Sequence, residues 1–319
     1  MPAQLLNQRQ KGFSLIELMI ALVLGLFIVG GVLAVFIGSS ASFSSNEALS
    51  RVQENGRFAL EIIAEDLRNT GNKGSCWGQV TDVINTGDAD YEADAYDLND
   101  PIKGWVAAAG EFFVADLNTY NANTDIVLIK HAADTVNATL SANVGSTAAS
   151  FPIAGGVIPG AILLLSDAAG CDLFQNTAAL NSSTLQRGTG GVTIGNETVL
   201  SQPLSHSYLG SGSTEISSLS STLYYVGSGT STASALRSVN YDNGVAADQE
   251  LVEGVVDLTL VYAVVSGAGP ALDYTNTAAD ITAANEWDDV VAVRVTVDIE
   301  GEQNISHQFT TTVALRNRL

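Results

Sequence analysis

The stretch QKGFSLIELMIALVLGLFIVGGVLAVFIG, residues 10–38, decides the architecture of the chain. Within it, residues 13–37 carry a single charge, on Glu17. Two basic residues, Arg9 and Lys11, stand just before this run. Because a helix rises about 1.5 Å per residue, the run is long enough to cross a hydrocarbon core of roughly 30 Å. The pattern therefore predicts a membrane-spanning helix near the N-terminus.

The basic residues set the expected orientation of this helix. No basic residue follows the run until Arg51, so the positive-inside rule places the N-terminus in the cytoplasm and the rest of the chain outside. The run is longer than the apolar core of a secretory signal and lacks a small-residue cleavage site, which favours a retained anchor. A plain signal anchor does not explain Glu17, because an ionised carboxylate inside a bilayer costs several kcal/mol unless it is paired.

The eight residues KGFSLIEL, 11–18, resemble the type III signal of type IV prepilins and pseudopilins. In that family a membrane peptidase cuts after the glycine and methylates the new N-terminal residue. The resemblance implies that residues 1–12 are a leader peptide, that cleavage falls between Gly12 and Phe13, and that Phe13 becomes N-methylated. It also implies that the Glu17 carboxylate neutralises the N-terminal amine of a neighbouring subunit during filament assembly.

The helix is expected to continue beyond the membrane. Residues 13–38 would form its transmembrane and filament-core part, and residues 39–71 an amphipathic second half. Apolar or small residues recur in the second half at steps of three and four, which is typical of one helical face. They are Leu49, Val52, Gly56, Leu60, Ile63 and Leu67. Gly71 is a suitable stop, so we expect one helix over about 13–70 with its outer half buried against a soluble domain.

Residues 72–319 are expected to form that domain, a β-rich head outside the cytoplasm. Apolar and polar residues alternate in 254–265 and 288–301, which predicts two half-buried strands. The polar turn EGEQN leads to a third alternating run in 306–319, so the C-terminus should be a hairpin. Shorter apolar runs predict further strands at 125–132, 161–167 and 222–227. The long polar stretches 176–221 and 227–250 are interpreted as loops or short irregular strands.

Several segments together resemble the minor pilins of the PilW type. They are RVQENGRFALEIIAEDLRNTG at 51–71, Cys76 soon after it, DLFQ at 172–175 following the second cysteine, and the closing VVAVRVTVDI and TTTVALRNR. The resemblance implies an α+β, type IV pilin-like fold, in which a long N-terminal helix packs on an antiparallel β-sheet with long loops. It implies a minor pilin that helps prime assembly of a type IV pilus and is incorporated near its tip.

The same resemblance implies a location and a set of partners. The protein would cross the bacterial inner membrane once, with a cytoplasmic N-terminus, and would then pass into the pilus at the cell surface. The implied partners are the prepilin peptidase, other minor and major pilins, the inner-membrane assembly machinery and a tip adhesin, in support of adhesion and twitching motility. Two alternatives stay open: a minor pseudopilin of a type II secretion system, and a surface-anchored binding module whose loops grip a surface or an ion.

Charge and cysteine content limit other functions. The net charge of −21 disfavours direct contact with nucleic acid, because an acidic surface repels phosphate backbones. The two cysteines, Cys76 and Cys171, form no C-x-x-C motif, and no histidine pair beside them suggests zinc. Since this part of the chain is expected in an oxidising compartment, a disulfide between them is the expectation.

Acidic, histidine and aromatic residues are the other candidates for sites in this sequence. The acidic tract at 82–100 includes a candidate calcium cluster, Asp88, Asp90, Glu92 and Asp94, but it lacks the glycine and terminal glutamate of a helix-loop-helix calcium site. A solvated acidic loop is therefore preferred, and no cofactor is expected beyond calcium as the candidate. The three histidines are scattered and no phosphate-binding or nucleophile motif occurs, so no enzyme activity is expected. The tryptophans and the pair Phe112 and Phe113 are interpreted as core or subunit contacts.

Overall fold

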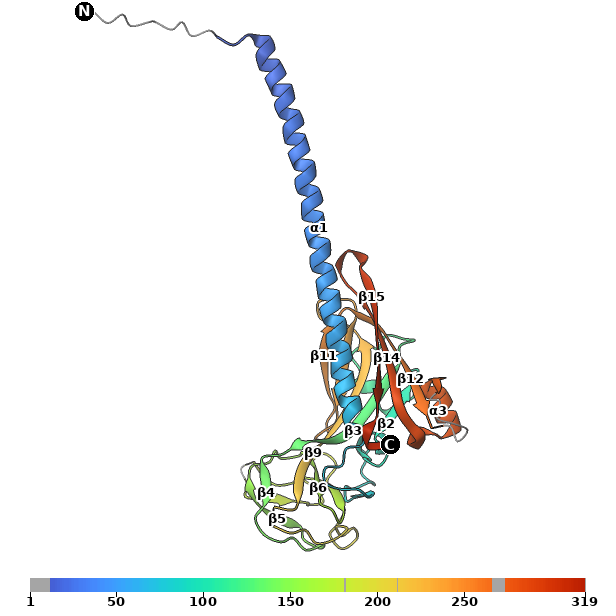
Figure 1. The fold of residues 1–319 in the computed structure, drawn as a ribbon. Coiled ribbons are helices and arrows are strands. Elements are labelled where there is room, and N and C mark those ends of the chain that lie inside the picture. The colour runs from blue at the N-terminus through green and yellow to red at the C-terminus, as the bar shows by residue number, and fades with distance from the viewer. Residues whose placement is uncertain (1–11, 181, 211, 266–272, 319) are drawn as a thin grey trace, which may run out of the picture. The chain divides into compact units, whose positions relative to one another are not determined.

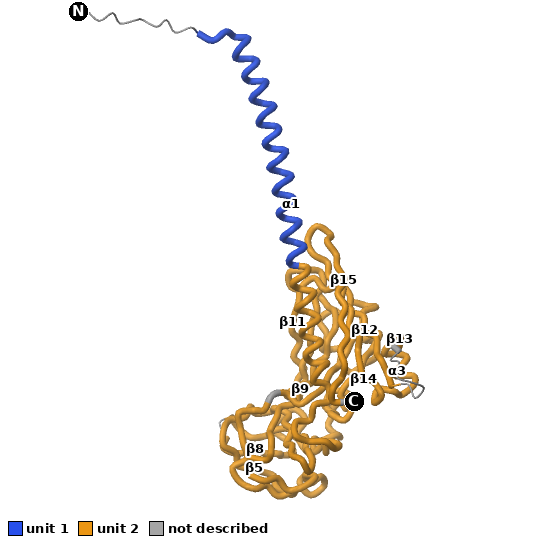
Figure 2. The backbone as a smooth tube through the Cα atoms, viewed as in Figure 1, with its two compact units in different colours: residues 1–51 blue, residues 52–319 orange. Residues whose placement is uncertain are grey.

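The computed structural model describes residues 12–180, 182–210, 212–265 and 273–318. Its first element, α1, is a 55-residue helix, Leu15–Asn69, close to the predicted 13–70. Gly71 ends it as predicted, with a φ of 72° that favours glycine and a backbone N–H that donates to the Lys130 carbonyl at 3.0 Å. The chain divides into two compact units, residues 1–51 and residues 52–319 (Figure 2).

The larger unit holds an eight-stranded sheet. Its path is β1 (Val80–Asp82), β7 (Cys171–Gln175), β6 (Ile162–Ser166), β9 (Glu215–Gly227), β10 (Ala235–Asn240) and β11 (Ala247–Glu253). Two further strands continue from β9: β3 (Ile126–Thr135) pairs with it, and β2 (Ile102–Trp105) pairs with β3. The β1–β7 pair is parallel and the remaining pairs of this sheet are antiparallel. The strands expected at 125–132, 161–167 and 222–227 are thus confirmed as β3, β6 and part of β9.

The C-terminal part of the chain forms a four-stranded antiparallel sheet. Its order is β13 (Asp273–Asn276), β12 (Val255–Val264), β14 (Val290–Glu300) and β15 (Ser306–Ala314). The predicted C-terminal hairpin is confirmed: β14 and β15 pair in continuous register from Ala292 with Ala314 to Glu300 with Ser306. The short helix α3 (Ala278–Ala284) starts with a capping box formed by Thr277 and Asp280.

A third, smaller sheet contains β4 (Ala138–Leu140), β5 (Ser150–Gly155) and β8 (Thr184–Gln186). These strands lie at the lower end of residues 52–319 in Figure 1, around a separate apolar core that includes Phe151, Phe174 and Leu185. The remaining helical pieces are short. They are α2 (Ala93–Tyr96), η1 (Phe112–Asp116), η2 (Trp287–Asp289), η3 (Glu302–Asn304) and η4 (Arg316–Arg318).

The end of α1 is built into the head. Val52, Ile63 and Leu67 are at most 2% exposed and share one core with residues of the eight-stranded and the C-terminal sheets. Phe309 on β15 lies so close to Gly56 that an added Cβ would stand 2.2 Å from the ring. The predicted apolar face therefore packs from Val52 onward, and its glycine makes room for an aromatic ring. Leu49, predicted as the first member of this face, is 38% exposed and does not belong to the core.

Of the two interpretations given to the polar stretches, loops or short irregular strands, the structure supports strands over part of each. Residues 227–250 contain β10 and most of β11, which pair with each other and extend the sheet from β9. Arg237 on β10 is 6% exposed and forms ion pairs with Asp248 and Glu250 on β11. The stretch 176–221 likewise holds β8 and the start of β9. Partly buried ion pairs and buried serines gave these strands a polar sequence that resembles a loop.

Candidate functional site

The start of α1 holds the residues that the sequence singled out. Gly12 and Phe13 precede the helix and are not helical, and the Phe13 side chain is 88% exposed. The peptide bond that joins them therefore lies outside the helix. The rest of the expected leader, residues 1–11, is outside the described residues.

Glu17 and Ser14 cap the helix reciprocally. Oε2 of Glu17 accepts hydrogen bonds from the backbone N–H of Ser14 at 3.1 Å and from its hydroxyl at 3.2 Å. The Ser14 hydroxyl oxygen in turn accepts the backbone N–H of Glu17 at 3.2 Å. This is a capping box, and it holds a carboxylate at the positive end of the helix dipole. The sequence reasoning missed Ser14, although its S-x-x-E spacing before an apolar run is a recognised start signal.

The helical surface that follows is apolar on all sides. Every large apolar residue between Leu15 and Ile37 is more than half exposed, from 53% at Leu33 to 78% at Leu15 and Leu26. The helix is long and apolar enough to span a membrane by length and composition. A helix that is apolar all round is stable when lipid or other apolar helices surround it. The described chain supplies no such cover to residues 15–37.

Cys76 and Cys171 form a disulfide with their Cα atoms 5.8 Å apart. The bridge joins the segment that leads into β1 to the first residue of β7, beside the parallel pair of Val80 and Cys171. The disulfide expected from the sequence is thus present in the structure. It secures the edge of the eight-stranded sheet.

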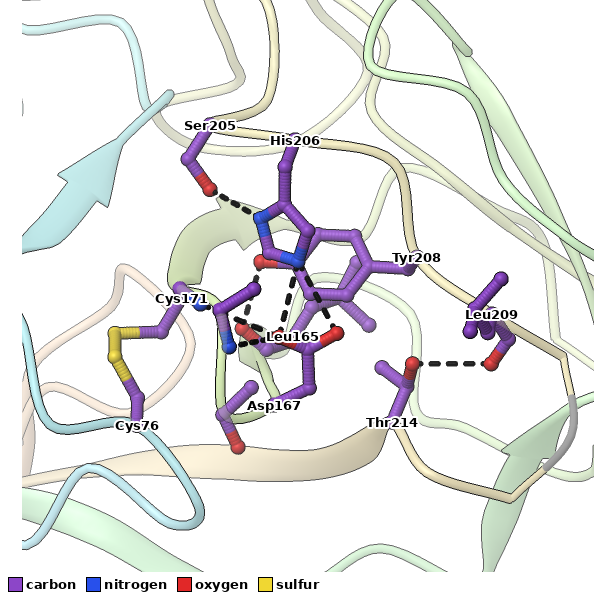
Figure 3. A network of polar contacts seen from close by, with 12 residues as sticks. Cys76, Leu165, Asp167, Cys171, Ser205, His206, Tyr208, Leu209 and Thr214 are labelled. Atoms are coloured by element: carbon purple, nitrogen blue, oxygen red, sulfur yellow. Dashed lines mark hydrogen bonds and ion pairs between the residues drawn. A yellow bond between two sulfur atoms is a disulfide. The ribbon is translucent and has the colours of Figure 1, made fainter.

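A polar network lies next to this disulfide (Figure 3). The buried Asp172, 0% exposed, accepts the Ser205 backbone N–H at 2.8 Å, the Ser205 hydroxyl at 2.7 Å and the Tyr208 hydroxyl at 2.5 Å. His206 places Nδ1 2.9 Å from the Ser205 hydroxyl oxygen and Nε2 3.0 Å from Asp167. Burial alone would raise the pKa of Asp167, but hydrogen bonds from His206 and two backbone N–H groups bring that pKa below its usual value.

This network unites a serine, a histidine and an acid that sequence spacing could not connect. A nucleophilic serine must pass its proton to the imidazole. Here the Ser205 hydroxyl donates to the Asp172 carboxylate at 2.7 Å, so its proton is directed away from His206. The arrangement is therefore that of a clamp, which ties the loop 205–208 to the start of β7, and it lends no support to nucleophilic catalysis.

The carboxylates of the acidic tract have separate surroundings and do not meet at one point. Asp88 accepts the backbone N–H of Asp90 at 3.0 Å, and Asp94 forms an ion pair with Lys103 at 2.6 Å. Asp90 and Glu92 are exposed to solvent. Across the residues that the structure describes, no group of three or more His, Cys, Asp or Glu side chains is placed to hold a metal ion. The four carboxylates considered for calcium thus do not form one ligand set.

A second polar cluster anchors the end of α1. Asp66 in its last turns accepts the Tyr224 hydroxyl of β9 at 2.6 Å and lies 3.4 Å from His131 Nε2 of β3. The other ring nitrogen of His131 lies 3.0 Å from the Ala132 carbonyl oxygen. Burial lowers the pKa of His131, but its hydrogen bonds with Asp66 and Ala132 outweigh burial and raise it. These contacts join the helix to two strands of the large sheet.

The aromatic residues divide between core and surface. Trp105 is 8% exposed, and its ring lies edge-on to Phe113 with centroids 4.9 Å apart. Trp287 packs partly buried against the core around α1 and meets the Tyr262 ring edge-on at 5.1 Å. Trp77, next to the disulfide, is 95% exposed. The core interpretation holds for Trp105 and Phe113 and does not hold for Trp77.

Two family models match the chain. The model for type IV pilus-assembly protein W matches residues 223–316, which run from within β9 to η4 and include the whole C-terminal sheet. The model for the prokaryotic N-terminal methylation motif matches residues 7–33, which include Gly12, Phe13, Ser14 and Glu17. No curated protein and no solved structure matches the chain significantly.

The motif and the apolar start of α1 fit a pilin that is anchored in the inner membrane and then assembled into a surface pilus. The pilin family that the two matches indicate is structural. With the methylation motif matched in residues 7–33 and the pilus-assembly model in residues 223–316, these two parts of the chain are similar to PilW-family type IV minor pilins.

Proposed function

We propose that the chain is cleaved between Gly12 and Phe13, methylated on Phe13, and built as a minor pilin into a type IV pilus through residues 15–37. The observation that carries this proposal is the helical surface that nothing in the described chain covers, with one carboxylate at its start. A bilayer can cover this surface before assembly, and the helices of other subunits can cover it in a filament.

The proposed role of Glu17 follows from charge and position. Cleavage creates an α-amine on Phe13, and an amine of this kind is largely protonated at neutral pH. Opposite charges attract strongly where the surroundings are apolar, whereas an unpaired carboxylate there is costly. The capping box keeps the Glu17 carboxylate at the very start of the helix, where the amine of a neighbouring subunit can reach it. Pairing between subunits would then favour docking in one register.

The match to type IV pilus-assembly protein W supports a role in assembly. On this proposal the chain primes the filament with other minor pilins, lies near the tip and supports adhesion and twitching motility. Its partners are the prepilin peptidase, other minor and major pilins, the inner-membrane machinery and a tip adhesin.

The test is intact-mass measurement and N-terminal sequencing of the chain from sheared surface filaments and from membranes. The expected product begins at methylated Phe13 and is present in the sheared fraction. A chain that keeps leader residues and is absent from filaments would instead be a plain membrane-anchored protein.

Two variants separate the charge of Glu17 from its role as a cap. Glu17→Gln keeps an oxygen that can accept from Ser14 but removes the charge, while Ser14→Ala removes the hydroxyl of the cap and keeps the charge. If pairing with the amine matters, Glu17→Gln should be cleaved normally yet lost from filaments, and Ser14→Ala should still be incorporated. Equal loss of both variants would mean that Glu17 acts only through helix capping.

A further inference from the structure

The head contains a pocket of about 330 Å³ that the assembly proposal does not use. Its wall comes from the acidic tract with α2, from η1, and from the segment that follows β10. No residue of α1 lines it, so ligand binding in this pocket does not depend on pilus assembly. The volume is at the lower end of the range found for ligand pockets, which is about 300 to 1,000 Å³.

Three carboxylates line the pocket, those of Asp90, Glu92 and Asp116. Asp90 and Glu92 are exposed, and within the described chain their side chains make no hydrogen bond or ion pair. Asp116 accepts the Tyr241 hydroxyl at 2.9 Å through Oδ2. None of the described lining residues is basic. The pocket therefore presents negative charge that no cation of its own wall neutralises.

Aromatic rings form the other part of the wall. Tyr96 and Tyr241 are 3% and 4% exposed, so their positions are fixed by packing, and Phe112 lies against Tyr241 with ring centroids 5.7 Å apart. Burial, followed by the nearby carboxylates of Asp116, Asp90 and Glu92, raises the pKa of Tyr96. All three acids thus act on the space that this ring borders.

We propose that this pocket binds the side chain of an arginine or lysine presented by a partner protein. Carboxylates form strong charge-assisted hydrogen bonds with guanidinium and ammonium groups, and aromatic rings attract the same cations. Arginine fits best, because its planar guanidinium can stack on a ring while it bonds to a carboxylate. The net charge of −21 favours approach of a basic protein surface over that of any anionic ligand.

The wall composition argues against the two competing ligands. Calcium prefers six to eight oxygen ligands, and within the described chain no three acidic side chains are placed around one ion. A neutral sugar would make no use of the three carboxylate charges. Calcium, and binding that does not depend on charge, therefore give the experiment its contrary outcomes.

The test uses the full chain in nonionic detergent and titrates it with Nα-acetyl-arginine N-methylamide, observed by saturation-transfer NMR. The citrulline counterpart of this probe has nearly the same shape without the charge. We expect the arginine probe to bind at least about fivefold more tightly than the citrulline probe, a difference set by the charge alone. Equal binding of the two probes would overturn the proposal.

Substitution of the pocket carboxylates tests whether the arginine probe binds in this pocket. Asp90→Asn combined with Glu92→Gln, and separately Asp116→Asn, should each weaken the arginine probe by about fivefold or more. Asp116→Asn keeps an acceptor for Tyr241, so the wall should remain folded. Glu54→Gln with Glu65→Gln removes two exposed carboxylates of α1 and is the matched control for net charge. An equal effect of the control, or displacement of the probe by calcium chloride at far lower concentration, would contradict a cationic side-chain pocket.

Discussion

Residues 15–37 and residues 52–69 belong to one helix, yet within the described part of the chain only the second segment packs against other elements. In the first segment the large apolar side chains are more than half exposed, while Val52, Ile63 and Leu67 in the second are nearly or fully buried. The first segment has an apolar surface on every side, and the second has a single apolar face. The folding of the second segment is therefore coupled to the head, whereas the first depends on a membrane or on other subunits.

The largest expected change in the stability of the head comes from removing the disulfide. Cys76→Ser with Cys171→Ser opens a covalent link across 95 positions of the sequence. We expect the head to lose about 4 kcal/mol of unfolding free energy, since longer loops gain most from closure. Denaturant titration of the full chain in detergent, followed by tryptophan fluorescence, measures the loss.

The same variant should leave residues 15–37 helical, because no cysteine lies within that segment. Circular dichroism after the head has unfolded would show the helix that remains. A loss of less than about 1 kcal/mol would contradict the stabilising role of the disulfide. Loss of the remaining helix would contradict the separation of the two segments.

Two isoleucine variants, one in each segment of α1, test which segment contributes to the stability of the head. Ile63 is 0% exposed, so Ile63→Ala should destabilise the head by about 3 kcal/mol through lost burial and the cavity that remains. Ile28 is 68% exposed, and Ile28→Ala should leave head stability unchanged. The same denaturant titration checks both variants. Equal effects would mean that the two segments of α1 unfold as one unit with the head.

The features that were predicted correctly from the sequence are those with local signals. The helix was predicted to within two residues of its ends, because an apolar run, an amphipathic stripe and Gly71 are all local signals. The hairpin of β14 and β15 was predicted because its strands alternate regularly and lie close in the sequence. At the proposed assembly site, the prepilin-like motif indicated Gly12, Phe13 and Glu17, but the S-x-x-E cap beside them was missed.

The features that escaped prediction depend on contacts between distant residues. The sequence left β10 and β11 undecided between loops and short irregular strands, because the charged residues Arg237, Asp248 and Glu250 neutralise one another only once the two strands pair. The pocket wall draws on residues from Ala89 to Ala246, whose rings and carboxylates share no spacing. Pairing and burial must be known before either feature can be recognised.

The two regions also differ in their titratable groups. Glu17 is the one charged residue of the first segment, whereas the head contains several buried titratable side chains. Burial raises the pKa of Asp82 from 3.8 to about 6, against the opposing hydrogen bonds from the Ile84 N–H and the Tyr91 hydroxyl. The folded state therefore holds this proton more tightly than the unfolded state. The resulting stability is present below 3.8 and is lost as pH rises through about 6.

Asp82→Asn should remove this dependence. Relative to the variant, the natural head should lose about 2 kcal/mol of unfolding free energy as the pH is raised across that interval. Denaturant titrations at several pH values measure the slope. Glu92→Gln, which changes an exposed carboxylate of the same tract, is the control and should leave the slope as it is. A slope that survives in Asp82→Asn would assign the effect to another acid.

The smallest expected effect concerns the anchor at the end of α1. Because the folded pKa of His131 is raised, its contribution is present below the ordinary value of 6.5 and is lost as pH rises through the folded pKa. His131→Gln should therefore cost about 1 kcal/mol in mildly acidic solution, the net worth of one hydrogen bond, and less in alkaline solution. Tyr224→Phe removes the other hydrogen bond to Asp66 and should act equally at both pH values. If the two variants show the same pH dependence, His131 does not titrate against Asp66, and the helix is held at this end by packing and the tyrosine alone.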